Sequence, residues 1–451
     1  MIGSDGFKKY FANFSWLFAD RVIRLLLVMV TGIFVTRYLG AELFGQLNYA
    51  VAIVSIAFML TSMGLNEIIV RDIVQHPERR DELLGTAFTI KFAGSLLLNV
   101  TVFAFALIKD LNAMTVTMIM CIAASEVFKP MMVTEYYFLS QVQGRVVAKV
   151  NIGQTLASSG FKLALVAMKA PLVWFAWSYA FENLAYAAGL YIAYRNQDLH
   201  IRAWRWSKRM AGYLLRQSWP LVIYGIALHI QLKIDQVMIF DILKKTIGED
   251  AANVEVGQYS VALKMIEALG FLPVIIQTSL APAIARARVQ DHALYRRRLV
   301  NQYRLMFLLF LVTSIPLYFI AEPLIVGLYG EDFKYAGHLL GLFAMRLIFP
   351  YMGVAKTSFI TNESLFKFSL LTAIVGASIN IGMNFVLIPT MRSNGALWAT
   401  MISFIVGIFL MDLLFKKTRE NFRMMAEAVF SFWRIRGSGE AMIVPAKRDA
   451  S

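Results

Sequence analysis

Long apolar stretches separated by short polar segments run along almost the whole chain. A helix needs about 20 mostly apolar residues to cross a bilayer. Twelve stretches satisfy this requirement, at about 13–37, 45–65, 83–108, 114–139, 146–168, 171–194, 215–242, 258–285, 303–328, 335–360, 367–389 and 395–415. In lipid only a helix satisfies its backbone hydrogen bonds within one segment, and the alternation typical of a β-barrel is absent from this pattern. The pattern predicts an all-α integral membrane protein with about twelve transmembrane helices.

Basic residues gather in every second connection between these stretches. One set of connections and ends holds Lys8, Lys9, Arg71, Arg79, Arg80, Arg145, Lys149, Arg195, Arg202, Arg205, Lys208, Arg209, Arg286, Arg288, Arg296, Arg297, Arg298, Lys367, Lys416, Lys417, Arg419 and Arg423. The other set holds only Lys109, Lys169, Lys244, Lys245, Lys334 and Arg392, besides Arg37 near a helix end. Cytoplasmic loops carry the excess of Lys and Arg, so both termini are expected in the cytoplasm.

A weak internal repeat divides the chain into two halves. Ser15-Trp16 at the first stretch recurs as Ser218-Trp219 at the seventh, and the segment 45–51 (GQLNYAV) recurs as 257–261 (GQYSV). Repeats of this kind are typical of transporters whose substrate site lies between the halves. We therefore expect two pseudo-symmetric six-helix lobes around a central cavity, with the division 1–197, a basic linker 198–214, 215–418, and a cytoplasmic end 419–451.

The cytoplasmic end begins with an amphipathic pattern. From Arg419 to Trp433 it predicts an interfacial helix on the membrane lipids, followed by a disordered tail over 437–451. The side chains expected to face lipid are Phe422, Met425, Val429, Phe430 and Trp433. Further up the chain, the outer connection from Lys244 to Gly257 is expected to be a loop that is long and mixed in charge.

Composition agrees with the membrane assignment. The chain is 58% hydrophobic with a mean hydropathy of +0.60, and 16% of its residues are charged, against about 25% in a typical soluble domain. A net charge of +15 can indicate nucleic acid, but the basic residues flank apolar spans and form no continuous stripe, so no nucleic-acid partner is expected. The single cysteine, Cys121, provides neither a disulfide within the chain nor a Cys-ligated metal site.

Motifs of soluble enzymes are missing from the sequence. It contains no phosphate-binding loop of the G-x4-G-K-[ST] type, so the chain is not its own ATPase, and no H-E-x-x-H motif. We expect no cofactor, no metal and no enzymatic activity.

Ionisable residues inside the apolar stretches are the most informative candidates for function. Each costs about 2.5–3.5 kcal/mol at the centre of a span, so they are expected to face the bundle interior or a water-filled cavity. There are eight cations, Arg21, Arg24, Lys91, Lys129, Lys162, Lys233, Lys264 and Arg346, and four acids, Glu126, Glu182, Asp235 and Glu267. The excess of cations predicts an anionic cargo.

The candidates differ in how well they are explained without a substrate. Arg21 and Arg24 share one helix face three residues apart, so they either bind phosphate or extend to the interface. Glu126–Lys129 and Lys264–Glu267 have the spacing of self-neutralising pairs. The residues predicted to lack a local partner are Lys91, Lys162 and Arg346, the last of which lies four residues before Pro350, where a broken helix is expected.

The acids allow two interpretations. A desolvated carboxylate at Glu182 or Asp235 suits proton or sodium coupling, and it equally suits a fixed counter-ion on a neighbouring helix. Glu126 and Glu267 are held open in the same way. Asn380 and Asn384, four residues apart, are expected to hold helices together.

Several segments resemble one family of membrane transporters. Residues 37–45 (RYLGAELFG) resemble the R-Y-L-G-x-x-x-F-G signature of polysaccharide-export flippases, the Wzx-type members of the multidrug/oligosaccharidyl-lipid/polysaccharide exporter superfamily. The segments 328–333 (LYGEDF), 353–359, and 384–389 (NFVLIP) with 395–400 (GALWAT) resemble later patterns of the same family. The resemblance spans Ser15 to about Leu414.

The resemblance implies a flippase of a bacterial inner membrane that moves an undecaprenyl-pyrophosphate oligosaccharide from the cytoplasmic to the outer leaflet by alternating access. For this family the connection from Lys244 to Gly257 is long, which makes it a candidate contact for a polysaccharide polymerase. It transfers no site residues, so the proposed cationic site (Arg21, Arg24, Lys91, Lys162 and Arg346) depends on the charge argument. A cation-coupled drug or metabolite exporter of the same superfamily is the alternative, although it would favour an acidic cavity. A membrane polymerase or ligase on the same lipid carrier would require a larger outer loop, and the lipid II flippase branch has two further spans.

Overall fold

A computed structural model describes residues 4–109 and 111–434, with the side chains of 4–15 and 17 left out. All regular secondary structure in these described residues is helical, and each of the twelve predicted spans lies on helix. The prediction of an all-α protein is confirmed. The predicted disordered tail at 437–451 lies outside the described residues.

The described part of the chain contains seven helical stretches that are long and apolar enough to cross a membrane. Two of them, Phe18–Gln75 and Phe366–Leu414, each cover two predicted spans; the other five, which cover one span each, are Pro77–Ile108, Ala113–Ser140, Glu249–Gln290, His292–Tyr329 and Glu331–Asn362. The predicted spans at 146–168, 171–194 and 215–242 are helical but less apolar, because polar residues interrupt them.

The chain packs into two compact units. Unit 1 contains the residues up to Ser260 with Val326–Phe333 and Ile381–Ala396, and unit 2 contains Val261–Ile325, Lys334–Asn380 and the residues from Leu397 onward. This packing division differs from the predicted lobes, whose boundaries stay a prediction.

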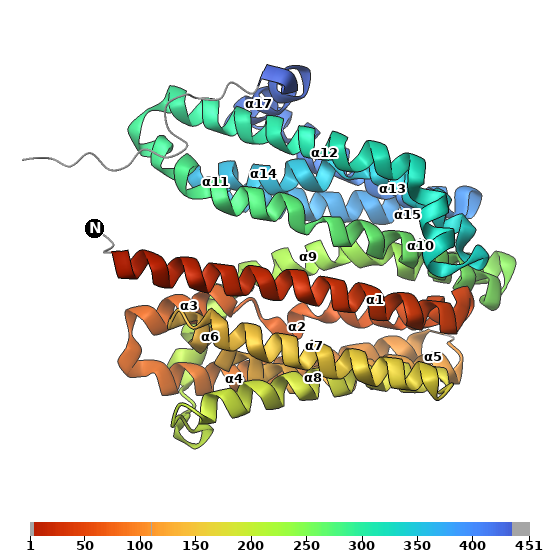
Figure 1. Cartoon of the computed structure of the whole chain (residues 1–451), viewed down its shortest axis with the longest axis horizontal. Coiled ribbons are helices and arrows are strands. Elements are labelled where there is room, and N and C mark those ends of the chain that lie inside the picture. Colours follow the sequence, from red (N-terminus) through yellow and green to blue (C-terminus); the bar gives the residue numbers. More distant parts are fainter. Residues whose placement is uncertain (1–3, 110, 435–451) are drawn as a thin grey trace, which may run out of the picture. The chain divides into compact units, whose positions relative to one another are not determined.

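Unit 1 is built mainly from the first nine helices. They are α1 (Ser4–Ala57), α2 (Met59–Ser62), α3 (Asn66–Gln75), α4 (Arg80–Ile108), α5 (Ala113–Ser125), α6 (Val133–Ser140), α7 (Gly144–Ala167), α8 (Leu172–Arg195) and α9 (Lys208–Ile247), with short 3₁₀ turns at Pro77–Arg79, Glu126–Met132 and Ile201–Ala203. α1 packs against α7, which packs against α8 (Figure 1). α1 breaks at Gly40, whose φ of 68° is accessible to glycine at little cost, so one continuous ribbon contains two predicted spans.

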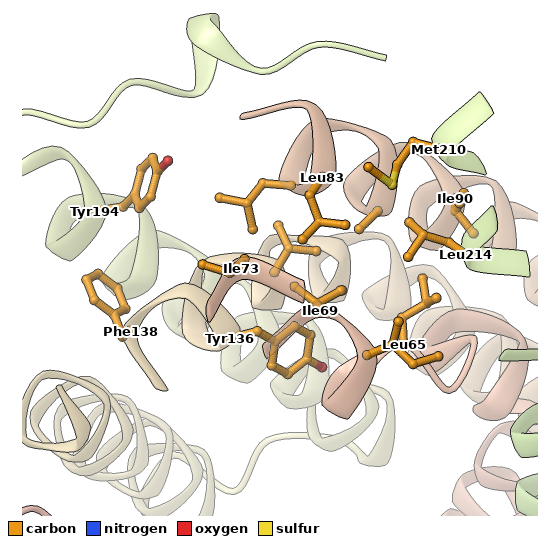
Figure 2. Packing of buried hydrophobic residues seen from close by; sticks show 14 of the residues in the cluster. Leu65, Ile69, Ile73, Leu83, Ile90, Tyr136, Phe138, Tyr194, Met210 and Leu214 are labelled. Carbon is orange, nitrogen blue, oxygen red and sulfur yellow. The ribbon is translucent and has the colours of Figure 1, made fainter. Parts of the chain in front are cut away.

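Polar side chains fix where two of these helices begin. The Asn112 side chain accepts a hydrogen bond from the backbone N–H of Thr115 and caps α5, and Ser207 does the same for Met210 at the start of α9. An apolar core includes the first turns of α9, where side chains from α3, α4, α6, α7, α8 and α9 meet (Figure 2). This core holds one end of unit 1 in a single arrangement.

Unit 2 contains the later helices. They are the second part of α10 (Glu249–Leu269), α11 (Phe271–Gln290), most of α12 (His292–Tyr329), α13 (Lys334–Arg346), α14 (Ile348–Asn362), part of α15 (Phe366–Phe404, broken at Arg392), a π-helical turn Ile405–Leu410, α16 (Met411–Leu414) and α17 (Arg419–Phe430), with a 3₁₀ turn at Phe432–Arg434. The first part of α10, up to Ser260, belongs to unit 1. So do the end of α12 with the 3₁₀ turn Glu331–Phe333, and the part of α15 at Ile381–Ala396.

Two expectations about connections and faces are wrong. The predicted loop from Lys244 to Gly257 is helical except at Gly248, whose φ of 88° turns the chain from α9 into α10. The amphipathic helix is present as α17, but Met425 is buried against the protein and does not face lipid, because α17 packs on α14 and α16. Phe430 and Trp433 are exposed, as predicted.

Candidate functional site

The two arginines of the first span have different surroundings. Arg21 lies on an exposed face of α1. The Arg24 Nε atom lies 3.1 Å from Oδ1 of Asp20, one turn earlier on the same helix, and Asp20 is itself buried and accepts a hydrogen bond from Asn151 of α7 at 3.2 Å. The sequence analysis missed Asp20, although the i,i+4 spacing to Arg24 could have revealed it.

Lys91 of α4 is almost completely buried, with 2% of its surface exposed. Its Nζ atom lies 3.3 Å from the Tyr136 hydroxyl, 3.5 Å from the Ser62 carbonyl oxygen and 5.2 Å from the centre of the Tyr136 ring. Within the described residues, no carboxylate comes within the 4.0 Å of an ion pair to this ammonium group. Lys91 is therefore a buried cation that is solvated by neutral oxygens and a ring.

Glu135 connects the surroundings of Lys91 and Arg24. It lies in α6 next to Tyr136 and accepts a 2.8 Å hydrogen bond from the Tyr186 hydroxyl of α8. It also interacts electrostatically with both cations at longer range. Glu135 was likewise not among the predicted charges. Unit 1 thus gathers two cations (Arg24 and Lys91) and two acids (Asp20 and Glu135) from α1, α4 and α6. Within the described residues, Arg24 and Asp20 form an ion pair, and Lys91 and Glu135 form none.

Lys162, predicted to lack a local partner, pairs with an acid on a neighbouring helix. Its Nζ atom lies 2.7 Å from Oε2 of Glu182, and 5.2 Å from the centre of the Tyr179 ring. The spacing of 20 residues hid this pair, because it forms between the adjacent helices α7 and α8. The pair agrees with the counter-ion interpretation of Glu182.

The other predicted acids are held in two ways. Glu126 and Lys129 form an ion pair at 2.5 Å, which confirms the local pair expected from their spacing. Asp235 is buried and accepts hydrogen bonds from the Tyr259 hydroxyl at 2.5 Å and from Asn384 at 2.8 Å. Asn384 therefore joins α15 to α9, as predicted, and Asn380 bonds Thr400 at 3.2 Å.

Lys264 and Glu267 lie on exposed positions of α10. Their pairing and the coupling role held open for Glu267 stay predictions.

Arg346 ends α13 in unit 2, and α14 starts after a break at Leu347. The break predicted near Pro350 is confirmed. The guanidinium carbon lies 4.9 Å from the centre of the Phe343 ring and 5.4 Å from that of Phe404, and the buried Nε atom has no hydrogen-bond partner. In the part of the chain that the structure describes, no carboxylate forms an ion pair with Arg346.

One buried ion pair of unit 2 escaped the sequence analysis altogether. Lys356 of α14 lies 2.6 Å from Oδ1 of Asp412 in α16 and donates to the Ile408 carbonyl at 2.9 Å. Asn421 of α17 donates to the second Asp412 oxygen at 2.6 Å and accepts from Tyr303 of α12 at 2.6 Å. This network is internally neutral and hydrogen-bonded.

The additional residues narrow the predicted charge excess. Adding Lys356 to the eight cations, and Asp20, Glu135 and Asp412 to the four acids, gives nine cations and seven acids. The predicted excess of about four positive charges therefore falls to two. Two cations, Lys91 and Arg346, are both deeply buried and without an ion pair among the described residues, and such groups can bind an anion that reaches them.

Comparisons with known proteins describe the same kind of molecule. The sequence model of a family described as "Polysaccharide biosynthesis protein" matches residues 10–288. No curated protein matches the sequence. Among solved structures, an inward-facing multidrug resistance MATE family transporter of the MOP superfamily aligns with a TM-score of 0.62 at 15% identity, over 91% of this chain and 98% of its own.

Two further structures have the same fold. A MOP superfamily transporter from Pyrococcus furiosus aligns with a TM-score of 0.53 at 13% identity, over 93% of this chain and 94% of its own. The lipid II flippase MurJ in an inward closed conformation aligns with a TM-score of 0.55 at 12% identity, over 94% of this chain and 92% of its own. At these identities the likeness shows the fold: a multi-pass, all-α membrane protein with the architecture of MOP superfamily transporters.

Proposed function

Because the chain belongs to the polysaccharide biosynthesis protein family, which confirms the resemblance seen in its sequence, we propose that it is a lipid flippase. Its cargo is a polyprenyl-pyrophosphate-linked oligosaccharide, which it moves from the cytoplasmic to the outer leaflet of the bacterial inner membrane for polysaccharide biosynthesis. Both termini lie in the cytoplasm, and the protein performs no chemical step.

The observation that supports this cargo is that two buried cations, Lys91 and Arg346, form no ion pair within the part of the chain that the structure describes. Removing one partner of a buried ion pair is strongly unfavourable because it leaves an uncompensated charge. A cation that is buried in this way is stabilised when an anion binds to it. A pyrophosphate carries the charge required, and its oxygens suit the planar guanidinium of Arg346 and the point charge of Lys91.

The remaining basic residues contribute less. Arg21 and Arg24 lie on α1, and Arg24 shares its charge with Asp20. Lys162 is neutralised by Glu182, so it is the least supported residue of the proposed cationic site. The pyrophosphate head contacts this set while the prenyl tail remains in lipid, and the protein exposes the site alternately to the two sides of the membrane.

Unexpected acids favour a second candidate, a cation-coupled exporter of drugs or metabolites. Asp20 and Glu135 lie beside cations in unit 1, and a carboxylate in such surroundings can exchange a proton or bind sodium. In this candidate the coupling residues would come from Asp20, Glu135, Glu126, Glu182, Asp235 and Glu267. A polymerase or ligase role is less supported, because the predicted long outer connection is helical.

The test is reconstitution of the purified protein in liposomes with a fluorescent polyprenyl-pyrophosphate oligosaccharide. We expect Lys91→Met and Arg346→Met each to slow its transbilayer movement at least tenfold, equivalent to about 1.4 kcal/mol. The matched controls are Lys149→Met and Arg286→Met, which remove exposed charges outside the proposed site. If the wild type does not move this lipid but exports a cationic dye when an ion gradient is applied, then the cation-coupled exporter is the correct function and the flippase is not.

A further inference from the structure

The repeated Gly-Gln pair has the same surroundings in each half of the sequence. Gly45-Gln46 lies in α1 just after the break at Gly40, and Gly257-Gln258 lies in α10 just after the turn at Gly248. Both pairs belong to unit 1 and lie at the ends of predicted spans that are remote from the basic connections. The weak repeat found in the sequence thus marks a defined place in the fold.

The two glycines form a reciprocal contact between α1 and α10. A Cβ atom on Gly45 would lie 1.8 Å from the carbonyl oxygen of Asn253, and one on Gly257 would lie 2.0 Å from that of Ala41. Each contacted residue lies four positions before the other glycine. The contact is therefore isologous, as at a two-fold axis. Ala41 and Gly45 have the small-xxx-small spacing of closely crossing membrane helices, and Asn253 takes the place of Ala41 on α10.

The two glutamines also have equivalent partners. The Gln46 Nε2 atom donates to Thr115 Oγ1 at 2.8 Å, in the first turn of α5 after the third predicted span. The Gln258 Nε2 atom donates to the Asp332 carbonyl at 2.6 Å, in the connection after the ninth predicted span. Each glutamine therefore binds the corresponding connection of its own half.

Polar pairs surround the crossing and join first-half to second-half helices. Asp241 near the end of α9 accepts from the Tyr49 hydroxyl at 2.9 Å and pairs with Lys109 at 2.5 Å. Asn112 donates to Glu249, the first residue of α10, at 2.6 Å. The Lys109–Asp241 and Asn112–Glu249 pairs are partly exposed, so water can replace their hydrogen bonds when they separate, whereas Tyr49 is fully buried.

We propose that this Gly-Gln crossing is the outer gate of the transporter, closed in this structure and opened for cargo release. The inference rests on the proposed function and on the predicted orientation. While the helices touch backbone to backbone, the crossing leaves no room for a methyl group, and therefore none for a lipid headgroup. Because neither glycine has a side chain, the two backbones touch directly at this point.

The first test opens the gate by adding one methyl group. In a Cys121→Ala background, Asn253→Cys reports on the crossing, because Asn253 is 3% exposed and Cys121 is the only native thiol. We expect Gly45→Ala and Gly257→Ala each to raise labelling by a membrane-impermeant thiol reagent at least fivefold. Gly32→Ala is the matched control on α1, because its Cβ meets nothing within 4 Å. Unchanged labelling in folded Gly45→Ala protein would overturn the proposal.

The second test locks the gate and remains informative if the glycine variants do not fold. The double variant Asn112→Cys with Glu249→Cys, again in the Cys121→Ala background, places two thiols where one of the polar pairs around the crossing lies. A short bifunctional thiol reagent should abolish lipid movement, and a reducing agent that cleaves the cross-link should restore it. Continued movement with the cross-link complete would contradict a gate here. Absence of movement before cross-linking would instead count against the flippase function, while the labelling test needs no cargo.

Discussion

Two buried cations of unit 2 show how different the surroundings of equally buried charges can be. Lys356 is 7% exposed and Arg346 is 6% exposed. Lys356 has Asp412 at 2.6 Å and a backbone carbonyl at 2.9 Å, whereas Arg346 lies between two phenylalanine rings with its Nε atom unbonded. Burial alone therefore does not indicate a binding site. The absence of a counter-ion among the described residues is what distinguishes Arg346.

The largest effect is expected where the charge is already neutralised. Asp412→Ala leaves the Lys356 ammonium buried without its carboxylate, which should lower the free energy of unfolding by about 3–5 kcal/mol. Denaturant titration in detergent micelles measures this change. The double variant Asp412→Leu with Lys356→Met should recover most of the loss, because it removes both charges and retains volume. A single variant as stable as wild type would show that the pair is not a structural one.

Arg346 should show the reverse behaviour. Arg346→Met removes an unpaired buried charge and keeps an apolar stem between the rings, so the free energy of unfolding should change by less than about 1 kcal/mol. Lipid movement should nevertheless fall at least tenfold. Arg346→Lys should lose less, about threefold, because it keeps the charge and loses the bidentate geometry. If Arg346→Met unfolds as readily as Asp412→Ala, then Arg346 is a structural charge in the same way as the Lys356–Asp412 pair.

The smallest effect is expected at the partly exposed pair of unit 1. Lys162 and Glu182 have 23% and 35% of their side chains exposed. Glu182→Gln should therefore change the free energy of unfolding by less than about 1 kcal/mol. Transport measured with and without a pH gradient should respond as in wild type. If transport by the variant no longer responds to the pH gradient, then Glu182 is a coupling residue, and the Lys162–Glu182 pair has a role in transport, as Arg346 does.

The sequence predicts what depends on short distances along the chain. Apolar stretches predict every helix that carries a span, and the i,i+3 spacing predicts the Glu126–Lys129 pair. Asp20 beside Arg24 has the same kind of local signal and was overlooked. The break after Arg346 follows from the proline nearby.

Pairs between helices could not be predicted in this way. Lys162–Glu182 and Lys356–Asp412 depend on which faces of neighbouring helices meet, and residue spacing does not contain that information. The repeat at Gly45 and Gly257 was visible, but its meaning was not, because only folding brings each glycine against the backbone of the other half. Side-chain burial on α17 was mistaken for the same reason, since a helix that packs on protein and one that lies on lipid can have the same apolar stripe.

The π-helical turn Ile405–Leu410 gives the last span a constraint on its number of residues as well as on their kinds. A π-helical turn holds one residue more than an α-helical turn would. Deleting one residue there would convert it into a regular α-helical turn and would leave the residues that follow on the same faces of the helix. Deleting one residue from the α-helical part of this span would instead rotate everything that follows by roughly 100°, since an α-helix has 3.6 residues per turn. Asp412 would then turn away from Lys356 and from Asn421 of α17. The span can therefore lose a residue and keep this network only within Ile405–Leu410.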